Sequence, residues 1–391
     1  MCNSYILYPA PVTQHIGAAG TRRFVTGSPY LRYNQTYMTA TALHDTLAST
    51  SAHLSEYSGA ATAADFGNVR AEFEALVADA GVYDLGWRAK ISVLGGDRTR
   101  WLNGMITNNV RDLAQGHGLY AFLLNPQGRV LADLYAYNRG SSLLVDTDQS
   151  QVRKVLEVFD HYIIMDDVEV AMNEKLTAIG IAGPKARGAL RSAGVEFPEL
   201  EPLQYHDLTW RNTELTIVRG DSPTVESYEL CLAPENVKSV WEALLKADAK
   251  PVGTAALELL RIASGIPRYG QDIREKDLPQ ETGQQRALHF TKGCYIGQEI
   301  VERIRSRANV HRSFIGFEIS GPLPALGIKI QADGKDVGEI TSSASLPVAG
   351  GENAVALGYL RREAALPGKQ LHAGGAAATV ANLPFSGVFK H

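Results

Sequence analysis

The sequence contains little cysteine and no long hydrophobic run. Its 391 residues include three cysteines, Cys2, Cys231 and Cys294, which are too few and too scattered for a disulfide framework or a Cys-x-x-Cys zinc site. No stretch reaches about 18 uninterrupted apolar residues, the length that a membrane-spanning helix requires. We therefore predict a protein of a reducing compartment, cytoplasmic and without a membrane partner.

A surplus of positive charge is also lacking. Thirty-eight basic residues face 42 acidic ones, so the formal net charge is −4. Freestanding nucleic-acid-binding domains usually carry excess Lys and Arg, which displace counterions from phosphates. Arg303 and Arg307 share a predicted helix face near Arg305 and Arg312, but such a local run is usually a solvated face. Direct binding of nucleic acid, tRNA included, is not expected.

The N-terminal region shows no regular pattern. Residues 1–37 have no sustained period of a helix or a strand, and we predict a poorly ordered extension over residues 1–49. Arg22 and Arg23 are paired as in a twin-arginine export signal, but polar residues follow them, so export is not predicted. Met38 opens a more protein-like stretch. Translation from Met38 is a hypothesis that the mass of the native N-terminal peptide would test.

The remaining sequence has the pattern of several mixed domains. Domains usually hold about 100 to 200 residues, so the length predicts two or three of them. Residues 68–80 carry the apolar stripe of a helix, and residues 119–124 and 129–137 have the pattern of a β-hairpin. Strands and helices mix without strict alternation, which favours an α+β fold. We predict two α+β domains and a small C-terminal β-barrel, with bounds of 50–165, 166–312 and 313–391.

The most unusual segment reads Phe-Thr-Lys-Gly-Cys-Tyr-Ile-Gly-Gln-Glu and covers residues 290–299. Three isoleucines recur here at helical spacing, which predicts a helix that begins just after Gly293: Ile296, Ile300 and Ile304. Cys294 would then lie at the helix N-terminus, where the helix dipole and Lys292 favour the thiolate. The alternative is a buried structural cysteine that behaves as a small hydrophobe. Position alone does not decide between them.

A long loop precedes this segment and contains Tyr269 and Glu281. Loops of this length usually bind ligands or are disordered. A buried carboxylate in the loop could accept two hydrogen bonds from a planar amino-heterocycle while Tyr269 or Tyr295 stacks on the ring. The alternative is a solvated loop with turn-forming residues. Glu299 has a similar alternative, an ordinary surface ion pair with Arg303.

Six motifs of the sequence resemble, in order, the folate-binding family of the glycine-cleavage T-protein, and most closely its YgfZ branch: Gly81–Asp84, Ile106–Val110, Asn125–Asp133, Gly265–Asp272, Lys292–Glu299 and Val337–Ser342. The match runs over residues 50–385, and its most specific part is Lys-Gly-Cys-Tyr-x-Gly-Gln-Glu. The resemblance implies a cloverleaf-like fold, with two α+β domains around a folate channel and a third, barrel domain. It also implies tetrahydrofolate or a derivative as the cofactor.

The resemblance further implies a role in iron-sulfur cluster assembly or repair, linked to tRNA modification through cluster enzymes. The implied partners are the assembly machinery or client [4Fe-4S] proteins. Cys294 matches the signature cysteine, with Lys292, Tyr295, Gln298 and Glu299 around it. The chain has too few cysteines to hold a cluster by itself. One thiol could supply a transient ligand, attack a partner's persulfide or disulfide, or sense oxidant, and catalytic turnover is left open.

The alternative function is that of a tetrahydrofolate-dependent aminomethyltransferase of the T-protein type. Glu281 falls where T-proteins place the acid that meets the pterin, and Asp133 falls at their paired aspartates. Two departures separate this chain from T-proteins. Ala132 stands where the first of the two aspartates is usual, and T-proteins lack the cysteine signature. Both departures favour the iron-sulfur role.

Overall fold

The computed structural model describes residues 39–307 and 310–389 of the chain. Most of the expected extension, with Cys2, the arginine pair and Met38, lies outside the described residues. Its last residues are regular, with strand β1 (Thr39–Ala40) followed by helix α1 (His44–Ala48). Leu43 and Leu47 are fully buried there. The described residues belong to one compact unit.

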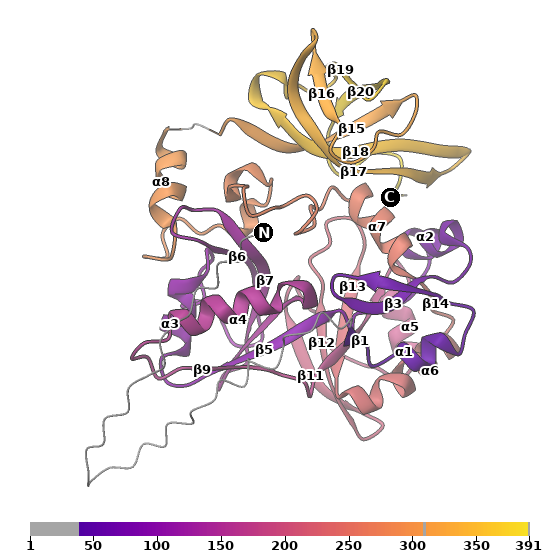
Figure 1. Ribbon diagram of the computed structural model, residues 1–391. Helices are drawn as coiled ribbons and strands as arrows, with labels where there is room; N and C mark the ends of the chain where they lie inside the picture. The colour runs from indigo at the N-terminus through magenta and orange to yellow at the C-terminus, as the bar shows by residue number, and fades with distance from the viewer. Residues whose placement is uncertain (1–38, 308–309, 390–391) are drawn as a thin grey trace, which may run out of the picture. The chain divides into compact units, whose positions relative to one another are not determined.

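An antiparallel sheet of five strands carries the predicted hairpin (Figure 1). Its order is β6 (Gly118–Leu124), β7 (Val130–Asn138), β8 (Leu143–Asp148), β5 (Arg88–Leu94) and β9 (Glu169–Met172). Phe122 lies opposite Asp133, and Tyr120 lies opposite Tyr135, which confirms the hairpin and places all four side chains on one face. Helix α4 (Val152–His161) contacts β7 and β9. Trp101 of helix α3 (Arg98–Met105) packs edge-on against Phe159 of α4.

A second large sheet holds six strands. Its order is β11 (Tyr205–Trp210), β12 (Thr213–Arg219), β13 (Ser227–Leu232), β10 (Thr177–Ala182), β4 (Gly81–Asp84) and β14 (Lys250–Pro251). Helix α6 (Val237–Lys246) contacts β10 and β4, and α5 (Ala186–Ser192) contributes Leu190 to the same core. The chain crosses between the two large sheets twice. β4 precedes the five-stranded sheet in sequence but joins this one, and the chain returns here after β9.

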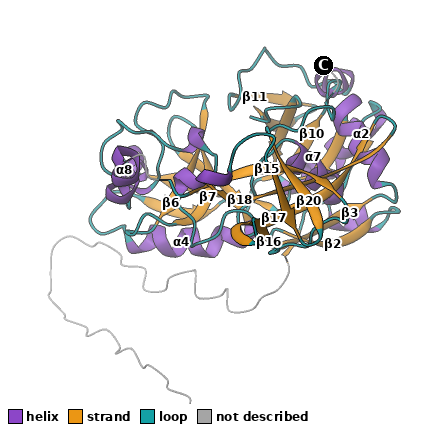
Figure 2. Cartoon of the chain, turned by 90° about the horizontal axis from the view of Figure 1, so that it is seen from above, coloured by secondary structure: helices purple, strands orange, loops and turns teal. Residues whose placement is uncertain are grey.

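A third sheet has three strands, in the order β1, β3 (Ala60–Asp65) and β2 (His53–Tyr57). Helices α2 (Val69–Ala78) and α7 (Thr254–Ala263) pack against each other, and α7 also contacts β3. The predicted stripe of α2 faces this core, because Phe73 and Leu76 are fully buried and Val69 is partly buried. Figure 2 shows α2 and α7 side by side near β3.

The C-terminal strands close into a barrel, as predicted. Its order is β15 (Arg312–Ser320), β18 (Gly351–Arg361), β17 (Lys335–Val348), β16 (Lys329–Ala332), β19 (Gln370–Ala373) and β20 (Ala376–Ala381). Phe317, Ile330 and Leu360 are fully buried in its core. Helix α8 (Gln298–Arg307) precedes the barrel. The fold is therefore two mixed α/β parts joined to a closed six-stranded barrel.

Candidate functional site

Asp133 lies in β7 with both carboxylate oxygens engaged. Its Oδ2 accepts a hydrogen bond from the Tyr120 hydroxyl at 2.8 Å, and its Oδ1 accepts one from Gln151 Nε2 at 2.8 Å. The Asp133 N–H donates to Gln151 Oε1 at 3.0 Å. Burial, followed by the Asp133 charge, raises the pKa of Tyr120, so the phenol keeps its proton as a donor. The carboxylate is thus held in one orientation on the sheet face.

Two loops meet over this face. Arg286, in the 3-10 turn Gln285–Ala287, lies with its guanidinium carbon 4.4 Å from the centre of the Tyr120 ring. It forms an ion pair with Asp221, which also accepts a hydrogen bond from the Tyr135 hydroxyl at 3.2 Å. Arg286 follows the long loop and Asp221 precedes β13, so the ion pair joins segments that are distant in sequence. Neither residue was singled out from the sequence.

Tyr269 and Tyr295 pack in the same cluster as Tyr120 and Phe122. The Tyr269 hydroxyl donates to the carbonyl of Leu131 in β7, and burial is the first cause that raises the pKa of Tyr269. The Tyr295 hydroxyl is buried and has no hydrogen-bond partner among the described residues. The structure therefore brings Asp133, Tyr269 and Tyr295 into one region, as the sequence motifs suggested.

An acid that sequence reasoning missed lies between the two large sheets. Glu229 is in β13, and its side chain is 26% exposed although Leu230 beside it is fully buried. Burial raises the pKa of Glu229, and the Lys90 ammonium at 3.8 Å opposes that shift. The rings of Tyr83 and Tyr137 pack in the cluster that fills this interface. The arrangement sets a carboxylate acceptor beside aromatic rings, which is the chemistry that the sequence had assigned to the long loop.

Buried ion pairs support the same interface. Arg88 Nε donates to Asp146 Oδ1 at 2.8 Å, and Arg88 Nη1 donates to Asp148 Oδ1 at 2.6 Å. Lys90 is 2% exposed and also contacts Asp146. Arg88 and Lys90 are two residues apart in β5, and Asp146 and Asp148 are two residues apart in β8. That period of two was a readable signal, because it puts the opposite charges on one face once the strands pair.

Glu281, which remains a predicted folate-binding residue, has partners within the protein. Its carboxylate is buried, accepts from the N–H of Leu278 at 3.2 Å and pairs with Arg312 of β15 at 2.9 Å. Arg312 also binds Asp277 at 2.6 Å and lies over the ring of Tyr359. These contacts link the long loop to the barrel. Within the described residues, Glu281 contacts neither Asp133 nor its partners Tyr120 and Gln151.

The predicted helix start at Gly293 is wrong. Helix α8 begins at Gln298, so Cys294 precedes it by one extended stretch and a turn, and the helix-dipole argument does not apply. Gly297 explains the difference, because its φ of +80° is left-handed and its missing Cβ leaves room for the carbonyl of Asn125. The expected isoleucine row is also incorrect, since Ile296 lies outside the helix and its N–H binds the carbonyl of Gly104.

Cys294 is a free, exposed cysteine, which contradicts its reading as a buried hydrophobe. Gln298 supports the turn after it, because its Oε1 accepts from the N–H of Tyr295 at 3.2 Å. Glu299 is exposed, and no ion pair joins it to Arg303 within the described part of the chain. The thiol of Cys294 is thus exposed on a loop, and the turn that follows it is held by Gln298.

Lys292 anchors that loop. Its Nζ donates to the carbonyls of Asn103, Ile106 at 2.6 Å and Asn108 at 2.7 Å, all at the end of α3 and just beyond it. Three acceptors match the three N–H groups of an ammonium. Burial and the Arg111 guanidinium lower the pKa of Lys292 to about 7. The side chain is 3% exposed, so its amine is committed to the scaffold.

Comparison with known proteins identifies the class. The GCVT N-terminal domain matches residues 43–292, and the CAF17 C-terminal beta-barrel domain matches residues 311–385. The chain belongs to the GCVT-domain family and carries a barrel of the CAF17 type, which confirms the resemblance. This family is a folate-binding one, as the sequence motifs implied.

Individual relatives are similar over most of their length. An aminomethyltransferase of Rubrobacter xylanophilus is 27% identical over 328 residues, which cover 83% of this chain and 87% of that protein. An aminomethyltransferase of Caldanaerobacter subterraneus is 27% identical over 77% of this chain and 83% of its own. The structure of the glycine cleavage system aminomethyltransferase T from Bartonella henselae has a TM-score of 0.83 at 20% identity, covering 90% of this chain and 99% of that one. That likeness establishes the fold.

Two kinds of feature are absent from residues 39–307 and 310–389. No helix there is long and apolar enough to cross a membrane. No cluster of three or more His, Cys, Asp or Glu side chains is arranged there to hold a metal ion.

Proposed function

We propose that this protein binds tetrahydrofolate or a related folate and acts in the assembly or repair of iron-sulfur clusters, with Cys294 as its reactive group. The observation that carries the proposal is the display of Cys294. The thiol is exposed, while Lys292 and Gln298 on either side of it are tied to the scaffold. The CAF17-type barrel supports the same branch of the family.

The side chains between the two large sheets have the chemistry that a folate requires. A pterin presents ring N–H and amino donors on one edge and a flat aromatic surface. The partly exposed Glu229 carboxylate supplies acceptors for that edge, and the rings of Tyr83, Tyr135 and Tyr137 supply apolar, planar surfaces. Asp133 lies on the same sheet face as Tyr135. Bound folate would supply one-carbon chemistry, while these side chains bind and orient it.

The thiol of Cys294 suits a transient role with a partner. A cluster normally needs four protein ligands, and this chain contains three cysteines, one of them the buried Cys231. Cys294 would therefore act as one temporary thiolate ligand to a cluster that the assembly machinery or a client protein holds with its own ligands. The cluster is cargo, and no resident metal site is needed in this chain.

The test measures the activity of a [4Fe-4S] enzyme in aerated cells that lack this protein. The wild type, Cys294→Ser and the matched control Cys231→Ala are restored at equal abundance. We expect rescue by the wild type and by Cys231→Ala, and little rescue by Cys294→Ser, because Cys294 is exposed whereas Cys231 is buried. Full rescue by Cys294→Ser would overturn the proposed role of the thiol.

One observation supports a second candidate function, the transfer of an aminomethyl group to tetrahydrofolate. Asp133 is held by Tyr120 and Gln151 on the sheet face, as a carboxylate that orients a reacting group would be. If this candidate is correct, purified protein transfers the aminomethyl group, Asp133→Asn abolishes turnover and Cys294→Ser retains it. Absence of turnover by the wild type would remove this candidate.

A further inference from the structure

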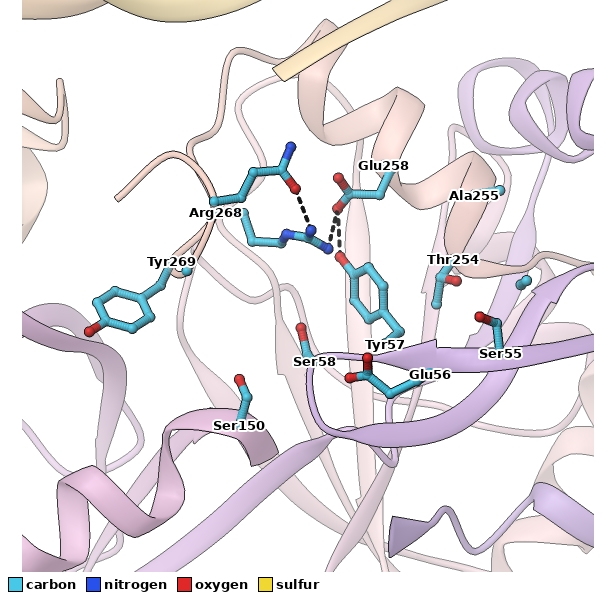
Figure 3. A pocket seen from close by; sticks show the side chains of 13 residues that line it. Ser55, Glu56, Tyr57, Ser58, Ser150, Thr254, Ala255, Glu258, Arg268 and Tyr269 are labelled. Carbon is cyan, nitrogen blue, oxygen red and sulfur yellow. Dashed lines mark hydrogen bonds and ion pairs between the residues drawn. The ribbon is translucent and has the colours of Figure 1, made fainter. Parts of the chain in front are cut away.

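A pocket of about 470 Å³ lies apart from Asp133 and Cys294, neither of which lines it (Figure 3). Its walls come from β2 and the turn after it, the first turns of α7, and the loop that follows α7. Tyr269 lines one part of the pocket, while Thr254 and Ser55 line another. The proposed function leaves this pocket without a role, although Arg268 and Tyr269 in its wall belong to the family motif Gly265–Asp272.

The acid in the middle of the pocket is already satisfied. Glu258 accepts a hydrogen bond from the Tyr57 hydroxyl at 2.6 Å and pairs with Arg261 at 2.8 Å. Arg268 approaches the same carboxylate to 3.4 Å and lies 5.0 Å from the centre of the Tyr57 ring. Burial raises the pKa of Glu258, but Arg261 and Arg268 outweigh it, so the net shift is downward. Glu258 is therefore a neutralised part of the wall.

Several donors at the start of α7 have no acceptor. The Thr254 side chain is 7% exposed, lines the pocket and makes no hydrogen bond within the described part of the chain. The cap residue Gly253 is extended and supplies no side-chain cap, and its own N–H is taken by Glu72 at 2.9 Å. The N–H groups of Thr254 and Ala255 in the first turn are left without a partner among residues 39–307 and 310–389.

The balance of donors and acceptors selects the ligand. The two first-turn N–H groups and the hydroxyls of Thr254 and Ser55 are donors, while the charge of Arg268 is opposed by Glu258. The remaining acid is Glu56, which is exposed at the rim and whose Oε1 already accepts from the N–H of Gly59 at 2.7 Å. A helix N-terminus with free N–H groups attracts anions. An acceptor-rich group therefore fits this part of the pocket best.

We propose that this pocket binds a small organic oxyanion, a carboxylate or a phosphate, at the start of α7. The oxyanion accepts from the Thr254 hydroxyl and from the N–H groups of Thr254 and Ala255, and the N-terminal end of the α7 dipole supplies the opposing partial charge. The rest of the ligand would extend toward Tyr269 at the other end of the pocket. The site is separate from the proposed folate site, so the two can be tested independently.

Calorimetric titration of the full chain tests this site with two probes that each join an aromatic ring to an oxyanion. p-Aminobenzoyl-glutamate carries carboxylates and adenosine monophosphate carries a phosphate; p-aminobenzamide and adenosine are their neutral counterparts. We expect one oxyanion probe to bind about tenfold more tightly than its neutral counterpart. Which probe binds identifies the source of the oxyanion. Binding should persist in saturating 5-formyltetrahydrofolate, which separates this site from the folate site.

Variants connect the binding to the pocket. Thr254→Val removes the hydroxyl at nearly constant volume and should weaken the probe about fivefold to tenfold, whereas Thr254→Ser should retain it. Thr379→Val in the barrel is the matched control and should change nothing. Two results would overturn the proposal: no binding of either oxyanion probe to the wild type at about 5 mM, or equal affinities in Thr254→Val and Thr254→Ser.

Discussion

The interface of the two large sheets and the loop that carries Cys294 use buried charge in different ways. Between the sheets, Lys90 and Arg88 face Asp146 and Asp148, so each charge has a partner of opposite sign. Behind the loop, Lys292 faces backbone carbonyls, and Arg111 adds a like charge. In the first arrangement burial lowers the pKa values of Arg88 and Lys90, but the carboxylates outweigh it, so both cations keep their protons. In the second arrangement, the charge behind the loop depends on whether the Lys292 amine carries a proton.

The largest effect is expected where the charges are paired. Asp146→Asn leaves Arg88 and Lys90 facing each other without their shared carboxylate, and removing one partner of a buried pair costs about 3 to 5 kcal/mol. Urea unfolding measures the loss. Asp207→Asn is the control, because its pair with Arg139 is largely exposed and should cost less than about 1 kcal/mol. Equal losses in the two variants would remove the distinction between this interface and the surface.

The second prediction concerns pH at the loop. The pKa of Lys292 is about 7 in the folded chain and 10.5 ordinarily, so between these values the unfolded chain holds a proton that the folded chain lacks. The free energy of unfolding should therefore rise with pH above 7 and fall as pH drops toward 7. From pH 7 to about pH 9 the gain should approach about 2 kcal/mol relative to Lys292→Met.

Urea unfolding at both pH values, in the wild type and in Lys292→Met, gives this difference directly. The variant serves as the control, since every other titrating group is common to both chains. Identical pH dependence in the two proteins would mean that Lys292 keeps its proton throughout. The three carbonyls would then dominate over burial, and the loop would be as insensitive to pH as the sheet interface.

The smallest effect is expected at Asp133. Gln151→Leu removes the donor to Asp133 Oδ1 and the acceptor of the Asp133 N–H. Tetrahydrofolate affinity, measured by calorimetry, should fall about fivefold because the carboxylate loses one of its two restraints. Gln331→Leu on the barrel, whose partner Asp336 is exposed, should leave the affinity unchanged. Unchanged affinity in Gln151→Leu would place the folate away from Asp133.

The sequence predicted the elements that depend on local patterns. The α2 stripe, the β6–β7 hairpin and the barrel all followed from apolar periodicity and turn residues, and the structure confirms them. The start of α8 was missed because the isoleucine spacing continues through Gly297, and periodicity does not report a left-handed backbone. Two glycines close to Cys294 were the available signal, since both Gly293 and Gly297 have positive φ.

The site was only partly predictable for a different reason. Asp133, Tyr269 and Cys294 lie in motifs, so each could be named without knowing its neighbours. Glu229 could not, because its importance comes from the facing of two sheets that pair strands distant in sequence. Arg286 and Asp221 are likewise far apart in the chain, and only the fold brings their loops together.

The two crossings of the chain between the large sheets have a consequence for any ligand held there. The chain passes from the six-stranded sheet to the five-stranded sheet between β4 and β5, and it returns between β9 and β10. Both connections are short, so they limit how far one sheet can move away from the other. The two walls are therefore held near each other before a ligand arrives, and less conformational entropy is lost when it binds.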